Sequence, residues 1–205
     1  MFNPIKNLIE SRVSTGRYDP ARSLSDQQLT ELVRLATRAP SAFNAQNWKF
    51  VAVRSAEAKA RLKAVSFGQQ QVEDAAVTFI VCGTLGAHRS MPRALQPSVA
   101  AGIVPQSVAD AWVAMATEAH QGNPQLQRDE AFRSASLAAM TLMLAAEGMG
   151  LSSGAMSGFD TDAVVKAFEL DASEVPVMLV TIGYGLANNW PQKPRRPLQD
   201  VMVLA

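Results

Sequence analysis

The segment from Phe132 to Met149 constrains the fold more than any other part of the chain. Its apolar side chains, among them Leu137, Met140 and Leu144, recur on every side of a helix rather than along one stripe. A helix that is apolar nearly all the way round is predicted to be fully buried. The glycines around its end are typical of a helix C-terminus. We therefore expect this helix to lie at the centre of the core, with the other elements packed around it.

Weaker patterns predict the surrounding elements. A capping box from Ser25 to Gln28 begins a helix that must end near Pro40. Further helices are expected at 5–13, 56–65, 108–119 and 160–168, and strands at 49–53, 76–82 and 177–183. Residues 198–204 are expected to add an edge strand. Helices around a few strands indicate an α+β fold with a sheet of mixed direction.

The length of 205 residues is most simply that of one domain, spanning 1–205. Within it, the stretch 83–106 contains several prolines and shows little periodicity. We therefore expect the region 83–123 to form a long excursion that serves as a lid. Residues 188–205 are rich in proline at their start and are expected to form an extended C-terminal arm.

Composition excludes several classes of function. The formal net charge of +1 does not favour nucleic acid as a partner. The single Cys82 rules out an intramolecular disulfide and, within its apolar strand, is expected to be an inert core thiol. No histidine has ligand-spaced partners, so no metal site is predicted. The absence of a signal-peptide or transmembrane pattern predicts a cytoplasmic protein that does not bind membranes.

Three clusters far apart in the chain carry residues suited to a phosphate-bearing ligand. They are Arg12-Val13-Ser14, the run from Pro40 to Trp48, and the run from Lys193 to Leu198. Guanidinium groups bind phosphate through paired hydrogen bonds, and a nearby hydroxyl adds another donor. Each cluster is also open to an ordinary structural interpretation: a helix end, a loop into a strand, and a solvated basic tail.

Taken with the small-residue strap at 154–160 (Gly-Ala-Met-Ser-Gly-Phe-Asp), these clusters resemble the nitroreductase family of flavin-dependent oxidoreductases. The resemblance runs from about residue 9 to residue 198. Its most specific part is the run 40–48, which is similar to the family pattern Pro-Ser-(Ser/Ala)-x-Asn-x-Gln-Pro-Trp. It implies a nitroreductase-like fold with a central mixed, mostly antiparallel sheet flanked by helices. It also implies an intertwined homodimer with flavin sites at the subunit interface.

The resemblance further implies which residues bind FMN. They are Arg12, Val13, Ser14 and Gly16 beside the phosphate and ribityl chain; Pro40, Ser41, Ala42 and Asn44 as a cradle; Gln69 at the polar ring edge; Met156, Ser157 and Gly158 along the ring; and Lys193 and Arg195 over the phosphate. Three positions depart from the family pattern. Gly16 stands where a second basic residue is usual, with Arg17 next to it; Asn47 replaces a proline; and Ser157 occupies a position that is often glutamate.

The implied function is an FMN-dependent oxidoreductase with a ping-pong mechanism. NADPH or NADH would reduce the flavin, and an electron-poor nitroaromatic, quinone or enone would then be reduced. No side chain is assigned as catalytic, because the chemistry takes place at flavin N5. The alternatives are a flavoenzyme of the same fold with another reaction (reductive dehalogenation or flavin degradation), a flavin-binding protein without turnover, and a helical scaffold without a ligand.

Overall fold

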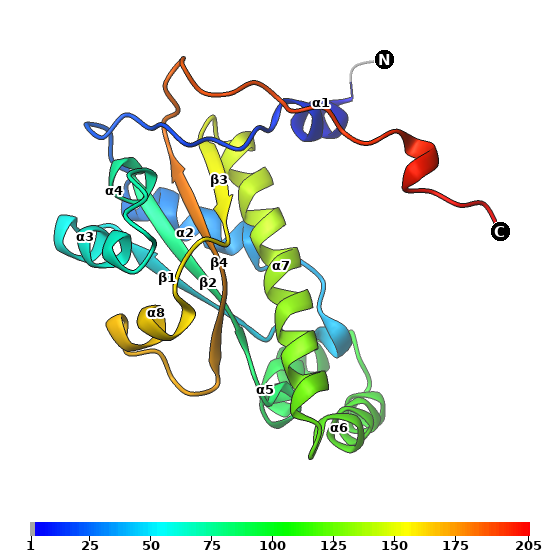
Figure 1. The fold of residues 1–205 in the computed structure, drawn as a ribbon. Coiled ribbons are helices and arrows are strands. Elements are labelled where there is room, and N and C mark those ends of the chain that lie inside the picture. The colour runs from blue at the N-terminus through cyan, green and yellow to red at the C-terminus, as the bar shows by residue number, and fades with distance from the viewer. Residues whose placement is uncertain (1–2) are drawn as a thin grey trace.

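The computed structural model describes residues 3–205, and a four-stranded sheet lies at its centre (Figure 1). The sheet has the order β1-β2-β4-β3, and its strands are β1 (Trp48–Val53), β2 (Val77–Thr84), β3 (Ser152–Met156) and β4 (Glu174–Gly183). All neighbouring strands are antiparallel, and Ser14 adds an isolated parallel bridge to Ser153. The strands predicted from β-branched runs are confirmed. The sequence of β3, Ser-Ser-Gly-Ala-Met, has too little β propensity to have been predicted as a strand.

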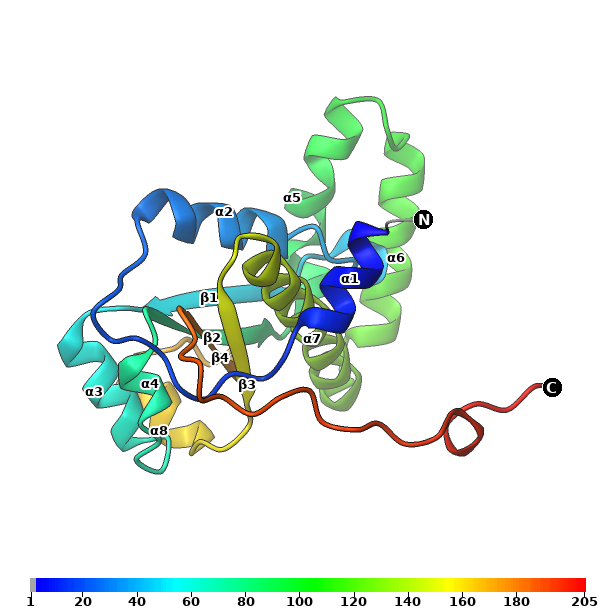
Figure 2. The same ribbon diagram turned by 90° about the horizontal axis from the view of Figure 1, so that it is seen from above.

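Helices cover both faces of this sheet (Figures 1 and 2). They are α2 (Asp26–Ala36) and α7 (Pro124–Gly148) on one face, and α3 (Ala56–Ala64), α4 (Gln71–Asp74) and α8 (Thr161–Ala167) on the other. Successive side chains of a strand point to opposite faces. Accordingly Phe79 and Val81 of β2 pack with α2 and α7, while Ile80 and Cys82 pack on the opposite side. The strand predicted to be buried on both faces is confirmed.

The long helix α7 is not buried all round within one chain. Ala135 and Ala139 are fully buried against the sheet, whereas Leu137 is 46% and Met140 is 38% exposed. The prediction of full burial is therefore wrong for the single chain, because one side of α7 faces outward. The buried side lies so close to β2 that a Cβ on Gly83 would be 2.3 Å from the carbonyl oxygen of Ala131.

The stretch predicted as a non-periodic excursion contains a helix. A helical pair, α5 (Ala87–Ala100) and α6 (Gln106–His120), projects from one end of the sheet (Figures 1 and 2). Pro92 and Pro97 lie inside α5, where each removes a backbone hydrogen-bond donor. Tertiary packing outweighs this cost, because α5 and α6 share a third apolar core of their own.

The two ends of the chain lie on the outside. A short α1 (Pro4–Ser11) precedes the first cluster, and the chain after β4 runs as an extended arm to a single turn of 3-10 helix at Leu198–Asp200 (Figure 2). The edge strand predicted at 198–204 is wrong: these residues form no strand and are exposed. Among residues 3–205, no helix is both long and apolar enough to span a membrane.

Candidate functional site

A cavity of about 330 Å³ opens where distant segments of the chain meet. Its walls are residues 14–17 after α1, Gly154 and Ala155 of β3, Gln71 at the start of α4, and residues of the C-terminal arm between 189 and 193. Two of the three predicted clusters and the predicted strap thus come together. The third cluster, around Pro40, lies elsewhere in the same chain.

The first wall is an extended segment that runs beside β3. Thr15 donates its backbone N–H to the carbonyl of Ser153 at 2.9 Å, next to the parallel bridge between Ser14 and Ser153. A Cβ on Gly154 would lie only 2.3 Å from the Thr15 carbonyl oxygen. Glycine is therefore required at 154 for the two walls to approach so closely.

Asn189 fastens the C-terminal arm to this wall. Its side-chain oxygen accepts the backbone N–H groups of Gly16 and Arg17, both at 2.9 Å, and its amide donates to the carbonyl of Arg17 at 2.8 Å. Gln192 adds a bond from its side chain to the carbonyl of Arg12 at 3.0 Å. Asn189 was not among the predicted site residues, and only its place in the extended arm could have suggested it.

Cations line the cavity and the hollow that adjoins it. Arg17 and Lys193 line it, and Arg195 lines an adjoining hollow of about 60 Å³ together with Ser14 and Lys193. The Arg195 guanidinium donates to the carbonyl of Lys193 at 2.7 Å, which orients it beside the arm. No carboxylate occurs among the described residues that line these two spaces. The part of the cavity beside Lys193 and Arg195 is therefore suited to an anion such as a phosphate group.

Gln69 and Gln71 have different surroundings: only Gln71 lines the cavity. Gln71 lines the cavity, and a Cβ on Gly16 would lie 3.1 Å from its Oε1. Gln69 instead donates from Nε2 to the carbonyl of Gly158 at 2.6 Å and so holds the end of the strap. Gln69, the residue predicted at the polar ring edge, lies beside the strap, and Gln71 is the glutamine that faces the cavity.

The strap presents its backbone and small side chains rather than its larger ones. Ala155 lines the cavity and Ser157 is exposed, while the side chain of Met156 packs into the core with Val164 and Leu179. At Met156 only the main chain is left for a ligand. Gly154 and Ala155 were missed as site residues because the family pattern directed attention to 156–158.

The loop around Pro40 lies apart from this cavity and packs on α5. Its backbone is unusual: Phe43, Asn44 and Gln46 all have positive φ, near 50°. Such strained positions cluster at functional sites. The hydroxyl of Ser41 accepts the backbone N–H of Gln46 at 2.9 Å and stabilises the turn. Pro40, Ala42 and Asn44 are exposed, so the loop is available to a molecule outside its own chain.

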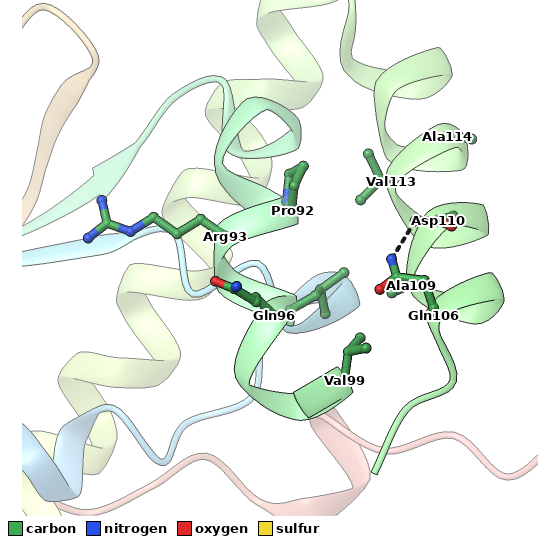
Figure 3. Close-up of a pocket in the computed structure, with 10 residues that line it drawn as sticks. Pro92, Arg93, Gln96, Val99, Gln106, Ala109, Asp110, Val113 and Ala114 are labelled. Atoms are coloured by element: carbon green, nitrogen blue, oxygen red, sulfur yellow. Dashed lines mark hydrogen bonds between the residues drawn. The ribbon is translucent and has the colours of Figure 1, made fainter. Parts of the chain in front are cut away.

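A larger cavity of about 550 Å³ lies between α5 and α6 (Figure 3). Its lining is mostly apolar, with Leu95, Val99 and Val113, and its rim carries a hydrogen bond of 2.7 Å from Gln106 to Asp110. The side chain of Arg93 points away from α6 (Figure 3). This cavity lacks the convergent polar groups of the first one.

Cys82 and the two histidines lie in the core, away from the cavity. Burial raises the pKa of Cys82 to about 12, so its thiol stays protonated. His88 and His120 stack at 5.9 Å between α5 and α6, and burial lowers the pKa of His88. Within residues 3–205, no group of three or more His, Cys, Asp or Glu side chains is placed to hold a metal ion.

These features define an α+β protein with a cationic, glycine-walled cavity at the edge of its sheet, suited to a phosphate-bearing ligand. The chain belongs to the Nitroreductase family, whose model matches residues 9–184.

Known proteins resemble the chain over nearly its whole length. YodC of Bacillus subtilis (strain 168), named as an NAD(P)H nitroreductase, is 35% identical over 95% of this chain and 96% of its own. A nitroreductase structure from Exiguobacterium sibiricum 255-15, solved in complex with FMN, has a TM-score of 0.91 at 28% identity and covers 100% of this chain and 99% of its own. The gut-bacterial enone reductase CLA-ER has a TM-score of 0.86 at 25% identity, covering 100% and 99%.

Proposed function

We propose that this protein is a homodimeric FMN-dependent oxidoreductase, which uses NAD(P)H to reduce electron-poor acceptors by a ping-pong mechanism. The observation that carries the proposal is the cavity in which residues 14–17, 154–155 and 189–193 meet, with cations and no carboxylate among the residues that line it and the adjoining hollow. The relative solved with FMN supports the cofactor, and the relatives named as NAD(P)H nitroreductases support the electron donor.

The residues present fit FMN. Lys193, Arg195 and the hydroxyl of Ser14 would hold the phosphate, with Arg12 two residues before Ser14 in the chain. The strap from Gly154 would lie along the ring and direct its backbone N–H groups at it, and the Gln71 amide would face a polar edge. Donors fixed before the reaction stabilise developing negative charge without reorganisation.

When bound, FMN would take a hydride from NAD(P)H and return it to an acceptor such as a nitroaromatic, quinone or enone. The chain's own part is to bind and orient. No Asp, Glu, His or Cys is among the described residues that line the cavity. We therefore assign no general acid or base, and solvent supplies the protons.

The site is proposed to be completed by a second copy of the chain. The exposed loop Pro40–Asn44 does not reach the cavity of its own chain, and so would cradle the flavin of its partner. The exposed apolar residues Ile5 and Ile9 of α1 and Leu137 and Met140 of α7 offer a surface for such a dimer. Burial of apolar surface is the main driving force of association.

The first test is the visible absorption spectrum of the purified protein after incubation with FMN, before and after anaerobic addition of NADPH or NADH. We expect a bound-flavin spectrum that bleaches with at least one donor. A protein that takes up no FMN would refute the proposal. Bound flavin that neither donor bleaches would favour a binding protein without turnover, and reduction of halogenated or flavin substrates alone would favour another reaction on the same fold.

Mixing two defective chains tests the shared site. One chain carries Lys193→Ala and Arg195→Ala, and the other carries Ser41→Ala and Asn44→Ala. If each site combines the arm of one chain with the loop of the other, mixed dimers contain one intact site, and FMN-dependent activity reappears. Sites formed within a single chain would show no such recovery.

A further inference from the structure

We propose that the hydroxyl groups of Tyr18 and Thr181 form a buried relay that holds the two walls of the flavin cavity at a fixed separation. Tyr18 is then a positioning residue for FMN: it does not line the cavity, and it acts through Thr15, which does. This inference rests on the proposed function, because it concerns how tightly and in what geometry the flavin binds.

The relay connects the walls through four short contacts. The Tyr18 hydroxyl lies 3.1 Å from the carbonyl oxygen of Thr15, which belongs to the N-terminal wall. It also lies 2.9 Å from Oγ1 and 3.2 Å from the carbonyl oxygen of Thr181, on β4. The Thr181 hydroxyl in turn lies 3.1 Å from the carbonyl oxygen of Gly154, in the strap wall. These contacts therefore link the Thr15 wall to Thr181 of β4, and Thr181 pairs with Gly154 of the strap wall.

Both residues are inaccessible to water, so the bonds do not exchange with solvent. Tyr18 is 1% exposed and Thr181 is fully buried. Burial raises the pKa of Tyr18 far above its usual value, and the phenol remains a donor. Two hydroxyl protons are available for these contacts: that of Tyr18 serves the Thr15 carbonyl, and that of Thr181 serves either the Tyr18 oxygen, which continues the chain of bonds, or the Gly154 carbonyl.

Packing makes the separation sensitive to these bonds. The Tyr18 ring lies against Gly183, where a Cβ would be 3.1 Å from its Cδ1, and a bridge to Gly185 holds its backbone. Without the Tyr18 hydroxyl, the Thr15 carbonyl must find another partner or water. We expect the walls to move apart when a hydroxyl is removed. Binding of a ligand that contacts both walls should then weaken most.

The test compares Tyr18→Phe and Thr181→Val with two controls. Tyr184→Phe removes the hydroxyl of the tyrosine that directly follows β4. This hydroxyl is not part of the relay. Thr117→Val removes a half-buried threonine hydroxyl that bonds the carbonyl of Val113 within α6, away from the cavity. For each protein, fluorescence titration gives the dissociation constants of FMN and of lumiflavin, which has the ring without the ribityl phosphate. The melting temperature of each protein is measured separately.

We expect each relay variant to weaken FMN binding about tenfold, with a smaller effect on lumiflavin. The double variant should cost little more than either single one, since both break one chain of bonds. Thr181→Ser should restore binding, and both controls should bind FMN like the wild type even if Thr117→Val melts earlier.

Two results would overturn the relay. One is an equal loss for FMN and lumiflavin that follows the fall in melting temperature, as in a generally destabilised protein. The other is unchanged FMN binding in Tyr18→Phe. FMN binding by the wild type tests the proposed function separately. If the wild type binds no FMN, both the proposed function and the role of the relay in flavin binding are refuted.

Discussion

Replacing Gly154 by alanine tests whether the close approach of the two cavity walls is required. The new Cβ would lie 2.3 Å from the Thr15 carbonyl oxygen, whereas real Cβ contacts are not found under 3.0 Å. The N-terminal wall must therefore recede by about 0.7 Å. Neither the backbone atom of Thr15 nor the buried Thr181, whose Oγ1 would be 3.0 Å away, can rotate aside as a flexible side chain would.

The displacement predicts losses in stability and in flavin binding. Overpacking of this kind costs about 1–3 kcal/mol of unfolding free energy. A misplacement approaching 1 Å can lower the reaction rate at a site by up to about 100-fold. We expect a loss of similar size in FMN affinity, roughly 10- to 100-fold. Urea unfolding of the FMN-free protein and fluorescence titration with FMN measure the two effects.

The matched control is Gly148→Ala at the end of α7, where the added methyl would lie 3.8 Å from Leu8 Cδ1, an ordinary contact. We expect this variant to fold and bind like the wild type. If Gly154→Ala unfolds within about 0.5 kcal/mol of the wild type and binds FMN normally, close approach at Gly154 does not constrain the cavity.

Three further predictions concern single side chains. Lys193→Ala should weaken FMN binding, and this loss should be smaller at high salt because salt screens the attraction. Arg196→Ala, which removes a cation outside the cavity lining, should change FMN affinity far less. Cys82 should not react with a thiol reagent such as DTNB at pH 8 in the folded protein and should react after denaturation, since burial raises its pKa to about 12. Because burial lowers the pKa of His88, the stability that its neutral form contributes is complete above the unfolded value near 6.5 and is lost as the pH falls below it. Urea unfolding should therefore weaken between pH 7 and pH 5, and His88→Gln should flatten this dependence; an unchanged profile would exclude His88 as the group.

Local sequence predicted those features that depend on local physics. The Ser25 capping box forms as expected, with Gln28 bonding back to the Ser25 backbone at 2.9 Å. The apolar run of β2 is buried on both faces, as a continuous run predicts. The first and last clusters carry their cations and hydroxyl in the chain order that the family pattern requires, so their meeting at one cavity could be predicted from the resemblance.

Other features depend on contacts that no local pattern encodes. Prolines in α5 argue against a helix, and the helix forms because α6 covers its apolar side. Which of Gln69 and Gln71 faces the cavity depends on where α4 begins relative to β3. The exposed Leu137 and Met140 look like core residues in the sequence because apolarity does not distinguish a chain's own core from a surface that a partner covers.

The residues alone were enough to specify the family, the class of fold and the chemical character of the ligand, since these depend on residue types and spacings along the chain. The separation of the cavity walls, the exclusion of the Pro40 loop from its own chain's cavity and the buried contacts of Tyr18 depend on packing between segments that lie far apart in the chain. Such distances are set by the whole core at once, because a wall can approach no closer than the atoms behind it allow.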